Sequence, residues 1–430
     1  NYCNHYIKIT ITCQRMVSFS KFTLDNGLRV IVHEDMSTPL VAVNLLYDVG
    51  SKDEDPSATG LAHLFEHLMF GGTSEIPEFD TPLLLAGGEN NAFTNSDITN
   101  FYITVPAENI ETAFWLESDR MNCLDFSNKS LEVQKKVVVE EFNQRYLNYP
   151  YGDSMLYLKP LAYKVHPYRW PTIGMDPSHI SDVTLSQTRD FFYSHYAPNN
   201  AILALAGKIT PSLAVELAEK WFGNIERRKI TIRELIAEPE QTEERTQVVE
   251  RDVAASAIFK VWHVSAARRE GFYECDMITD LLAGGESGRL SARLIKRKKL
   301  FSEIDAFITA DIDPGLLIIH GKLMKEADME EANDSINEII EELNTKYVSA
   351  PEMEKVKNKY ESSFIYGNTS ILNKAMNLAY FDLLGNTNLI NEEADLYRGV
   401  DKFGVMNTAH KYLNPENCST LYYKSTRKEQ

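Results

Sequence analysis

The sequence predicts an α+β protein made of two homologous α/β halves, each a mostly antiparallel sheet packed with helices. Two observations lead to this fold class. Strand-like and helix-like segments are mixed along the 430 residues without strict strand–helix–strand alternation, which argues against a doubly wound nucleotide-binding fold. The order of segments in the first half also recurs in the second half, which indicates an internal duplication.

The elements of the first half follow from the periodicity of the residues. Asp25-Asn26-Gly27 between two apolar runs predicts a β-hairpin, because Asn-Gly adopts the positive φ angles of a tight turn. The segment 60–70 has apolar residues at positions i, i+3, i+4 and i+7 and ends at Gly71-Gly72, which predicts a helix. The other elements expected in this half are strands at 41–49, 99–105 and 201–207 and helices at 110–119, 131–146, 185–196 and 213–222.

The repeat sets the domain organisation that we expect. The sequence LMFGG at 68–72 corresponds to LLAGG at 281–285, and the helix at 131–142 corresponds to the segment 351–362. Similar elements in the same order favour a duplication over a chance similarity of two α+β segments. The predicted divisions are an N-terminal extension at 1–15, a first half-domain at 16–225, a charged linker at 226–252 and a second half-domain at 253–430.

Composition and charge exclude several classes of protein. The chain has 44 Lys and Arg against 62 Asp and Glu, a formal charge of −18, so it lacks the cationic excess of a general nucleic-acid binder. No window approaches the roughly 18 consecutive apolar residues of a membrane-spanning helix, and residues 1–15 do not resemble a secretory signal. The five scattered cysteines indicate reduced thiols. We therefore expect a cytoplasmic protein, with the mitochondrial matrix as the alternative.

Residues suited to catalysis are concentrated in the motif H-L-F-E-H at 63–67. At about 100° per residue, His63, Glu66 and His67 fall on one arc of a helix, and apolar residues fill the opposite arc. Histidines at i and i+4 place two ring nitrogens near one Zn²⁺, and the carboxylate beside them can accept a proton from water at that metal. H-x-x-E-H is the inverzincin signature. The alternative is a solvated polar face, for which Lys and Arg are the usual residues.

A zinc site with two histidines needs a third protein ligand. The candidate carboxylates are Glu140 and Glu141 in the segment V-V-V-E-E-F at 137–142. Here the sequence resembles peptidase family M16, of the M16B type, which pairs H-x-x-E-H with a glutamate that lies tens of residues further along the chain. The family includes pitrilysin, insulin-degrading enzyme and the mitochondrial processing peptidases. The resemblance covers nearly everything after Met16 and implies Glu141 as the ligand, with Glu140 as the fallback.

The resemblance implies the LuxS/MPP-like metallohydrolase fold and the activity of a zinc metalloendopeptidase subunit. His63, His67 and Glu141 would hold Zn²⁺, and Glu66 would be the general base toward the attacking water. Peptides or unfolded polypeptide segments would be hydrolysed inside a chamber closed by two such units. Two other functions are open: a non-catalytic scaffold subunit with a relic metal site, and a metal-dependent hydrolase of non-peptide amides.

The second half lacks the metal motif. At the repeat offset, Asp276, Thr279 and Asp280 stand where the first half has its two histidines and its glutamate. We therefore expect metal chemistry in the first half alone.

One segment of the first half resembles the edge strand on which members of the family bind substrate. It contains Asn91, Ala92 and Phe93, which are the expected substrate-binding residues, because an extended peptide can add to such an edge as a further strand. A polar turn that leads into a strand explains this segment equally well.

The sequence departs from the pattern of the family in two places. Many members have a glutamate seven residues before the ligand glutamate, where this chain has Gln134, so a supporting charge near the metal is missing. Active members also face the zinc with an Arg and a Tyr from a second-half segment, where this chain has Ile295 and Ser302. A one-residue slip would bring Lys296 or Arg297 to the position of the Arg, but no tyrosine lies nearby. The resemblance therefore implies a heterodimer whose M16-like partner supplies both groups, with a homodimer as the alternative.

Overall fold

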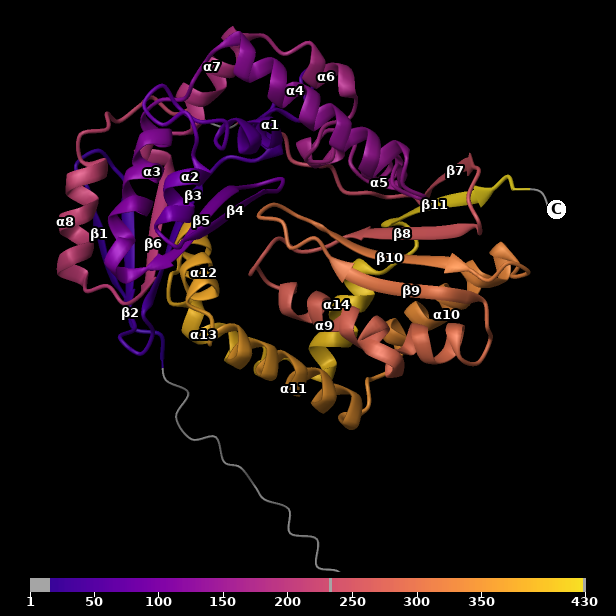
Figure 1. Ribbon diagram of the computed structural model, residues 1–430. Coiled ribbons are helices and arrows are strands. Elements are labelled where there is room, and N and C mark those ends of the chain that lie inside the picture. The colour runs from indigo at the N-terminus through magenta and orange to yellow at the C-terminus, as the bar shows by residue number, and fades with distance from the viewer. Residues whose placement is uncertain (1–15, 232–233, 428–430) are drawn as a thin grey trace, which may run out of the picture.

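The computed structural model describes residues 16–231 and 234–427, which form two lobes that are each built on one β-sheet (Figure 1). The predicted extension, residues 1–15, lies outside the described residues. The first sheet has the order β1-β2-β6-β3-β5-β4; β2 and β6 run parallel, and the other neighbours run antiparallel. Its strands are β1 (Ser20–Thr23), β2 (Arg29–Glu34), β3 (Leu40–Tyr47), β4 (Glu89–Thr94), β5 (Thr99–Pro106) and β6 (Ala201–Gly207).

The predicted hairpin begins the first sheet. β1 and β2 pair antiparallel, and Gly27 in the turn has a φ of 93°, which glycine adopts without strain. Asn26 is buried, and its side-chain amide donates to the carbonyl oxygens of Phe222 and Ile225 at 2.8 and 2.9 Å. The turn therefore anchors the hairpin to the end of helix α8 (Pro211–Phe222).

The second sheet repeats the first. Its order, β7-β11-β8-β10-β9, matches β2-β6-β3-β5-β4, and the parallel pair β7 and β11 corresponds to the parallel pair β2 and β6. The expectation of two similar α/β halves with mostly antiparallel sheets is confirmed. The strands of this sheet are β7 (Arg245–Arg251), β8 (Ala257–His263), β9 (Phe301–Ile308), β10 (Leu316–Leu323) and β11 (Cys418–Ser425).

Helices cover both sheets, and a hydrophobic core fills each lobe between sheet and helices. In the described part of the chain, no helix is both long and apolar enough to cross a membrane. The helices of the first half are α1 (Leu61–Leu68), α2 (Asp80–Leu85), α3 (Ile110–Asn122), α4 (Asn128–Phe142), α5 (Ser154–Ala162), α6 (Pro177–Ser181), α7 (Leu185–His195) and α8. Those of the second half are α9 (Phe272–Ala283), α10 (Met329–Thr345), α11 (Ala350–Gly367), α12 (Ile371–Leu383), α13 (Leu389–Gly399) and α14 (Lys402–Tyr412).

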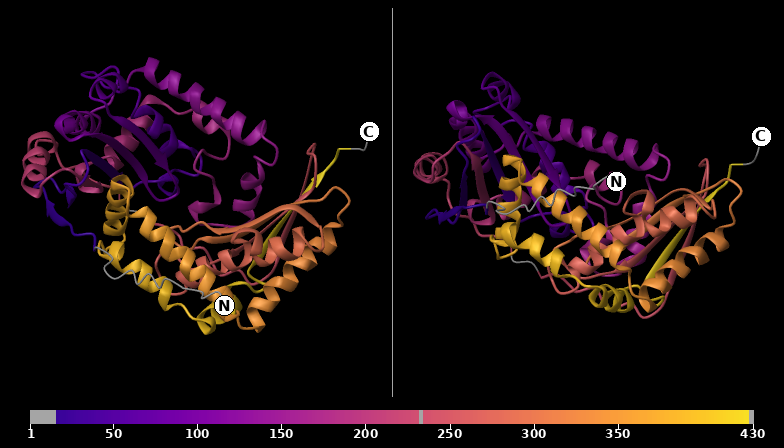
Figure 2. Two further views of the ribbon diagram at one scale, coloured as in Figure 1. Left: turned by 60° about the horizontal axis from the view of Figure 1, so that its bottom comes forward. Right: turned by 90° about the horizontal axis from the view of Figure 1, so that it is seen from below.

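Each half contributes one helix to the sheet of the other half. α5 packs against β7, β8 and β11 of the second sheet, and α12 packs against β3 and β6 of the first sheet (Figures 1 and 2). Ala42, Ala204 and Ala206 of the first sheet share a buried cluster with Ala375 and Ala379 of α12. These small side chains allow α12 to lie close to the first sheet. Because α5 packs on the second sheet and α12 on the first, this exchange of helices joins the two lobes.

The range 226–252, expected to be a linker, is more structured than a linker. Its last part forms β7, because β11 provides a parallel partner for it. Before this strand, the Glu238 carboxylate accepts hydrogen bonds from the backbone N–H groups of Lys164, Val165 and His166 at 2.7–2.9 Å. The connecting segment is therefore shorter than predicted and is attached to the first half.

Candidate metal centre

The helix that carries the H-x-x-E-H motif, α1, begins at a turn that requires glycine. Gly60 has a φ of 94°, and a Cβ at this position would lie 2.4 Å from the carbonyl oxygen of Ile173. The Glu54 carboxylate accepts hydrogen bonds from the N–H groups of Gly60 and Ala62, both at 2.8 Å. These amides have no partner within the helix, so Glu54 fixes the start of α1.

The two faces of α1 have different surroundings. Leu64 and Phe65 are fully buried in the first core, where Phe65 stacks on Phe191. His63 and His67 lie one turn apart, with ring centroids 4.9 Å from each other, and both line a cleft. The packing of one face therefore holds the two imidazoles of the other face in place.

Glu141 reaches the histidines from α4, which packs beside α1. Its Oε2 lies 3.2 Å from Nε2 of His67 and 3.8 Å from Nε2 of His63. Glu140 is exposed, and its Oε1 accepts a hydrogen bond from the side-chain amide of Gln144. The structure thus brings Glu141, and not Glu140, to the two histidines.

The donor set of His63, His67 and Glu141 fits zinc. Each residue offers one ligand atom, and the three atoms lie within 4.8 Å of one another. Donors at about 2.0–2.1 Å from one tetrahedral ion are about 3.3 Å apart, so the three side chains need only small movements to surround Zn²⁺. Two imidazoles and one carboxylate also match the ligands of catalytic zinc sites that keep a fourth position open.

The protonation states of these side chains favour metal binding. Burial lowers the pKa of His63 to about 4, so its imidazole is neutral at neutral pH, as a metal ligand must be. The hydrogen bond with His67 lowers the pKa of Glu141, and the nearby Arg145 acts in the same direction. The Arg145 guanidinium lies 3.0 Å from Oε1 of Glu141. One carboxylate oxygen is thus held by Arg145 while the other faces the histidines.

Glu66 lines the same cleft and is held by the neighbouring strand. The Thr94 hydroxyl, at the end of β4, donates to Oε2 of Glu66 at 2.7 Å. Burial raises the pKa of Glu66, and the bond from Thr94 opposes this rise. A partly buried carboxylate of raised pKa is suited to accept a proton and to release it again.

The cleft beside these side chains has a volume of about 690 Å³. Ala92 and Phe93 of β4 line it, and Phe93 is 39% exposed. β4 is the last strand of its sheet, so one side of this strand has no neighbouring strand. Asn91 lies on β4 outside the cleft lining, and its side-chain oxygen accepts a hydrogen bond from the N–H of Ala92.

Two family profiles match the chain. The one described as "Insulinase (Peptidase family M16)" matches residues 29–158, and the one described as "Peptidase M16 inactive domain" matches residues 182–360. The chain belongs to peptidase family M16. The first profile includes all the residues of the candidate metal centre, and the second covers much of the half that lacks the motif.

Curated relatives of this M16 chain are named zinc proteases. "Zinc protease PqqE" of Helicobacter pylori is 28% identical over 415 residues, which cover 94% of this chain and 92% of that protein. "Uncharacterized zinc protease YmxG" of Bacillus subtilis is 27% identical over 356 residues, 80% of this chain and 83% of that one.

Solved structures share the fold of this M16 chain. A protease from Helicobacter pylori matches with a TM-score of 0.91 at 26% identity, over 95% of this chain and 100% of that one. Pitrilysin matches with a TM-score of 0.75 at 18% identity, over 97% of this chain and 47% of that longer chain. The second similarity shows the fold alone.

In the second half of this M16 chain, hydrogen bonds occupy the positions that correspond to the motif. The Tyr397 hydroxyl donates to the Asp276 carboxylate at 2.5 Å, and Asp280 forms an ion pair with Lys359. The Thr279 hydroxyl donates to the carbonyl oxygen of Asp276 at 2.7 Å. Within residues 16–231 and 234–427, His63, His67 and Glu141 form the one cluster of three side chains that suits a metal ion.

The positions that depart from the family pattern lie outside the cleft lining. Gln134 is half-buried on α4, two turns before Glu141. Ile295 packs against the core of the second lobe. Ser302 is exposed on β9, and its hydroxyl donates to the carbonyl oxygen of Lys322 at 3.1 Å.

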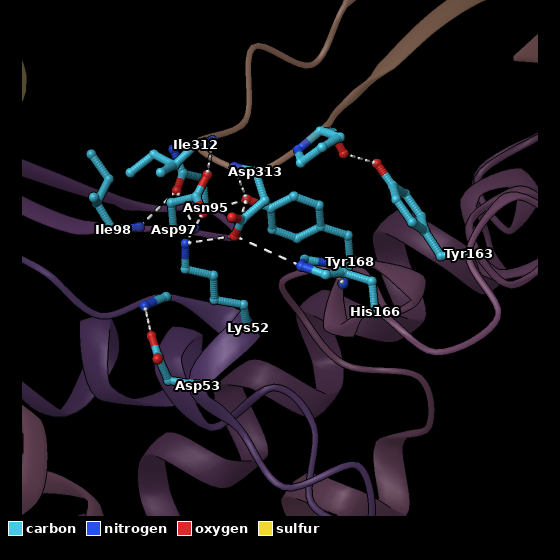
Figure 3. A network of polar contacts seen from close by, with 12 residues as sticks. Lys52, Asp53, Asn95, Asp97, Ile98, Tyr163, His166, Tyr168, Ile312 and Asp313 are labelled. Atoms are coloured by element: carbon cyan, nitrogen blue, oxygen red, sulfur yellow. Dashed lines mark hydrogen bonds and ion pairs between the residues drawn. The ribbon is translucent and has the colours of Figure 1, made fainter. Parts of the chain in front are cut away.

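A network of buried charges attaches the second lobe beside the cleft (Figure 3). Asp97, in the turn after β4, pairs with the Lys52 ammonium at 2.5 Å and accepts a hydrogen bond from the Tyr168 hydroxyl at 2.5 Å. Its second oxygen accepts from the N–H of Ile312 at 2.8 Å, and Asp313 lies 3.3 Å from Lys52. The loop between β9 and β10 is therefore fixed against the end of the edge strand.

Several side chains around the centre were not assigned a role from the sequence. Arg145 stands four residues after Glu141, and this helical spacing is a signal that could have identified it. Thr94 belongs to the segment recognised as the edge strand, but its bond to Glu66 depends on the packing of α1 against β4. Glu54 has no signal in the sequence, because its role depends on how the chain returns to the start of α1.

Proposed function

We propose that this M16 chain is the catalytic subunit of a zinc-dependent endopeptidase. The observation that carries the proposal is the convergence of His63, His67 and Glu141 from two helices, with Glu66 in the same cleft. The names of the relatives support zinc as the metal and peptides as the substrate class.

Each residue of the cleft has a defined part in this proposal. His63, His67 and Glu141 hold Zn²⁺, which when bound polarises the scissile carbonyl and makes a water molecule more acidic. Glu66 takes the proton from the attacking water and delivers it to the leaving amine. The hydrogen bond from Thr94 keeps the Glu66 carboxylate directed into the cleft during both transfers.

Substrate binds in this proposal as an added strand at β4. Alternate residues along the segment 91–93 direct their backbone groups to the free side of β4, where an extended peptide or an unfolded segment of a larger chain can pair with them, and the N–H of Ala92 would have to exchange its bond to the Asn91 side chain for such a partner. Because backbone pairing does not depend on side chains, this mode of binding accepts many sequences, and side chains that line the cleft have to supply the selectivity.

A partner subunit completes the proposed site. Ile295 and Ser302 stand where active members of the family are expected to have Arg and Tyr, and neither can replace them as a donor toward the substrate. Pitrilysin contains about as much chain again as the part that this fold matches, which supports pairing of two such units. We propose a heterodimer around a substrate chamber, with a homodimer as the alternative.

The compartment that we propose is reducing: the cytoplasm, or the mitochondrial matrix as the alternative. Cys123, Cys275 and Cys418 are free thiols in the structure, which supports this assignment.

The test combines metal content with hydrolysis. Protein purified without chelator is expected to contain stoichiometric zinc and to cleave unstructured peptides, and removal of zinc should abolish cleavage until zinc is returned. Zinc-loaded protein that cleaves no peptide, alone or with a partner subunit, would instead be a scaffold with a relic site. Cleavage of small amides but not of peptides would identify a hydrolase of another class.

A further inference from the structure

Helix α5 forms part of the cleft and also covers the second sheet. Met155 and Lys159 lie one turn apart on this helix and line the cleft. Leu158 and Ala162 of the same helix are fully buried in the core beneath the second sheet. Lys159 is therefore presented to the cleft by a helix whose other face is fixed.

Each carboxylate of the cleft has a close polar partner, whereas its one lysine has only a backbone carbonyl oxygen. Glu141 pairs with Arg145 at 3.0 Å, and Glu66 accepts the bond from Thr94. The Lys159 ammonium donates to the carbonyl oxygen of Trp170 at 3.3 Å. Among the side chains that the structure describes, no carboxylate lies within ion-pair distance of this ammonium, so two of its three N–H donors are available to a ligand.

Two carboxylates, Asp311 and Asp97, influence Lys159 from beyond ion-pair distance, and Lys159 in turn is the cation that lowers the pKa of Asp311 most. Burial lowers the pKa of Lys159, and Asp311 and Asp97 raise it. Asp97 is paired with Lys52. An ammonium that is partly withdrawn from water without a close anion is unfavourable, and a carboxylate brought by a ligand relieves this cost.

We propose that Lys159 is a specificity residue that binds an acidic side chain of the substrate near the scissile bond. This inference rests on the proposed peptidase function and defines its substrates further: extended segments with Glu or Asp at a position that lies beside α5. Backbone pairing with β4 places the chain in the cleft, and the charge-assisted hydrogen bond to Lys159 selects among sequences. A bond of this kind is expected to favour the acidic substrate about tenfold.

The experiment uses pairs of peptides that are identical except for Glu or Gln, with this residue moved along every position near the scissile bond. At one or two positions, kcat/KM of the wild type should be about tenfold higher for Glu, mainly through a lower KM. Lys159→Met should bring this ratio close to one, whereas Lys159→Arg should keep a preference for Glu. Lys164→Met is the matched control, because Lys164 is exposed and lies outside the cleft lining.

Several outcomes overturn the inference. A ratio near one at every position in the wild type, or an unchanged ratio in Lys159→Met, removes the proposed contact. If Lys159→Met lowers kcat/KM equally for Glu and Gln peptides, Lys159 supports the structure of the cleft and does not contact the acidic side chain. If Lys159→Met does not fold, the wild type alone provides the test. Its ratio of kcat/KM for Glu over Gln peptides should fall as salt is added, because salt screens a contact between charges, and a ratio that salt does not change contradicts the inference.

Binding measurements separate this inference from the proposed function. Fluorescent Glu and Gln peptides are titrated against the zinc-loaded Glu66→Gln protein, which is expected to bind without cleavage. Preferential binding of the Glu peptide together with no hydrolysis by the wild type contradicts the peptidase proposal and supports the role of Lys159. Hydrolysis without any preference, in binding or in rate, contradicts the role of Lys159 alone.

Discussion

His67 and Glu141 meet across the contact between α1 and α4, with Nε2 and Oε2 3.2 Å apart. Adjacent residues of a helix point about 100° apart, so Glu140 is directed to solvent while Glu141 faces α1. This difference between two neighbouring glutamates identifies which of them completes the cluster, and it makes the pair a matched test of the metal centre.

Glu141→Gln is expected to lose zinc, because the amide is a weak ligand and carries no charge to offset that of the ion. The decrease in affinity should exceed the roughly 10–100-fold that is typical of groups that only support a ligand. Glu140→Gln, with the same chemical change one position earlier, should keep stoichiometric zinc. Zinc content after dialysis and competition with a chelator measure both. Zinc loss in Glu140→Gln with retention in Glu141→Gln would reverse the assignment.

Glu66→Gln is expected to keep zinc and to lose hydrolysis. The amide preserves the shape of the side chain but cannot accept a proton, so kcat should fall by about 10²–10⁴-fold. Zinc content measured on the same sample separates this effect from metal loss. Wild-type turnover in this variant would show that another group is the base.

The two similar halves and the positions of the motif residues could be predicted because each depends on local pattern. The spacing of His63 and His67 places them on one helix face whatever the surrounding fold, and the repeat of strands and helices is visible in the chain. The pairing of His67 with Glu141 needed the resemblance to a family, because residues on different helices meet only through tertiary packing.

The exchange of α5 and α12 between the sheets could not be predicted. Periodicity shows that β6 is apolar on both faces, but it does not show which helix covers the second face. The charge of Lys159 was visible, whereas its place in the cleft depends on α5 lying between the metal centre and the second sheet. Arrangements of this kind follow from contacts between distant segments.

Ala379→Leu is expected to destabilise both lobes together. Ala379 is fully buried between α12 and the first sheet, and three added carbons have no space there, at a cost of about 1–3 kcal/mol. Val215→Leu on the exposed side of α8 is the control and should be nearly neutral. Thermal unfolding followed by circular dichroism measures the change. An Ala379→Leu protein as stable as the wild type would show that α12 is not tightly packed on the sheet.

The attachment of the lobes through Asp313 is expected to depend on pH. His166, whose Nε2 lies 3.7 Å from the Asp313 carboxylate, lowers the pKa of Asp313 to about 2, and Lys52 acts in the same direction. An unfolded Asp has a pKa of about 3.9, so the stabilisation is present above that pH and is lost as the pH falls through about 2. Asp313→Asn should cost about 1–2 kcal/mol at neutral pH.

The difference in melting temperature between the wild type and Asp313→Asn should therefore shrink as the pH is lowered from 7 through about 4 toward 3. Asp395→Asn is the control, because Asp395 is exposed and lies outside the network. A difference that stays constant over this range would mean that the charge of Asp313 does not hold the loop.

We expect the rate of peptide hydrolysis to depend strongly on a partner subunit. Ile295 packs against the second core and has no side-chain donor, and Ser302 donates to the backbone of a neighbouring strand, so a second copy of this chain has neither the Arg nor the Tyr expected at these two positions. Such donors act on the oxyanion that develops as the carbonyl is attacked, and removal of one typically costs 10²–10³-fold in rate.

The chain alone should thus bind zinc and hydrolyse peptides slowly. A partner of the same fold that lacks H-x-x-E-H and carries both donors should raise kcat by about 10²–10³-fold, and the same partner with its Arg replaced by Ala should not. Rapid hydrolysis by the purified chain, at a rate that no such partner increases, would contradict the heterodimer and favour a catalytic site that is complete in one chain or in a homodimer.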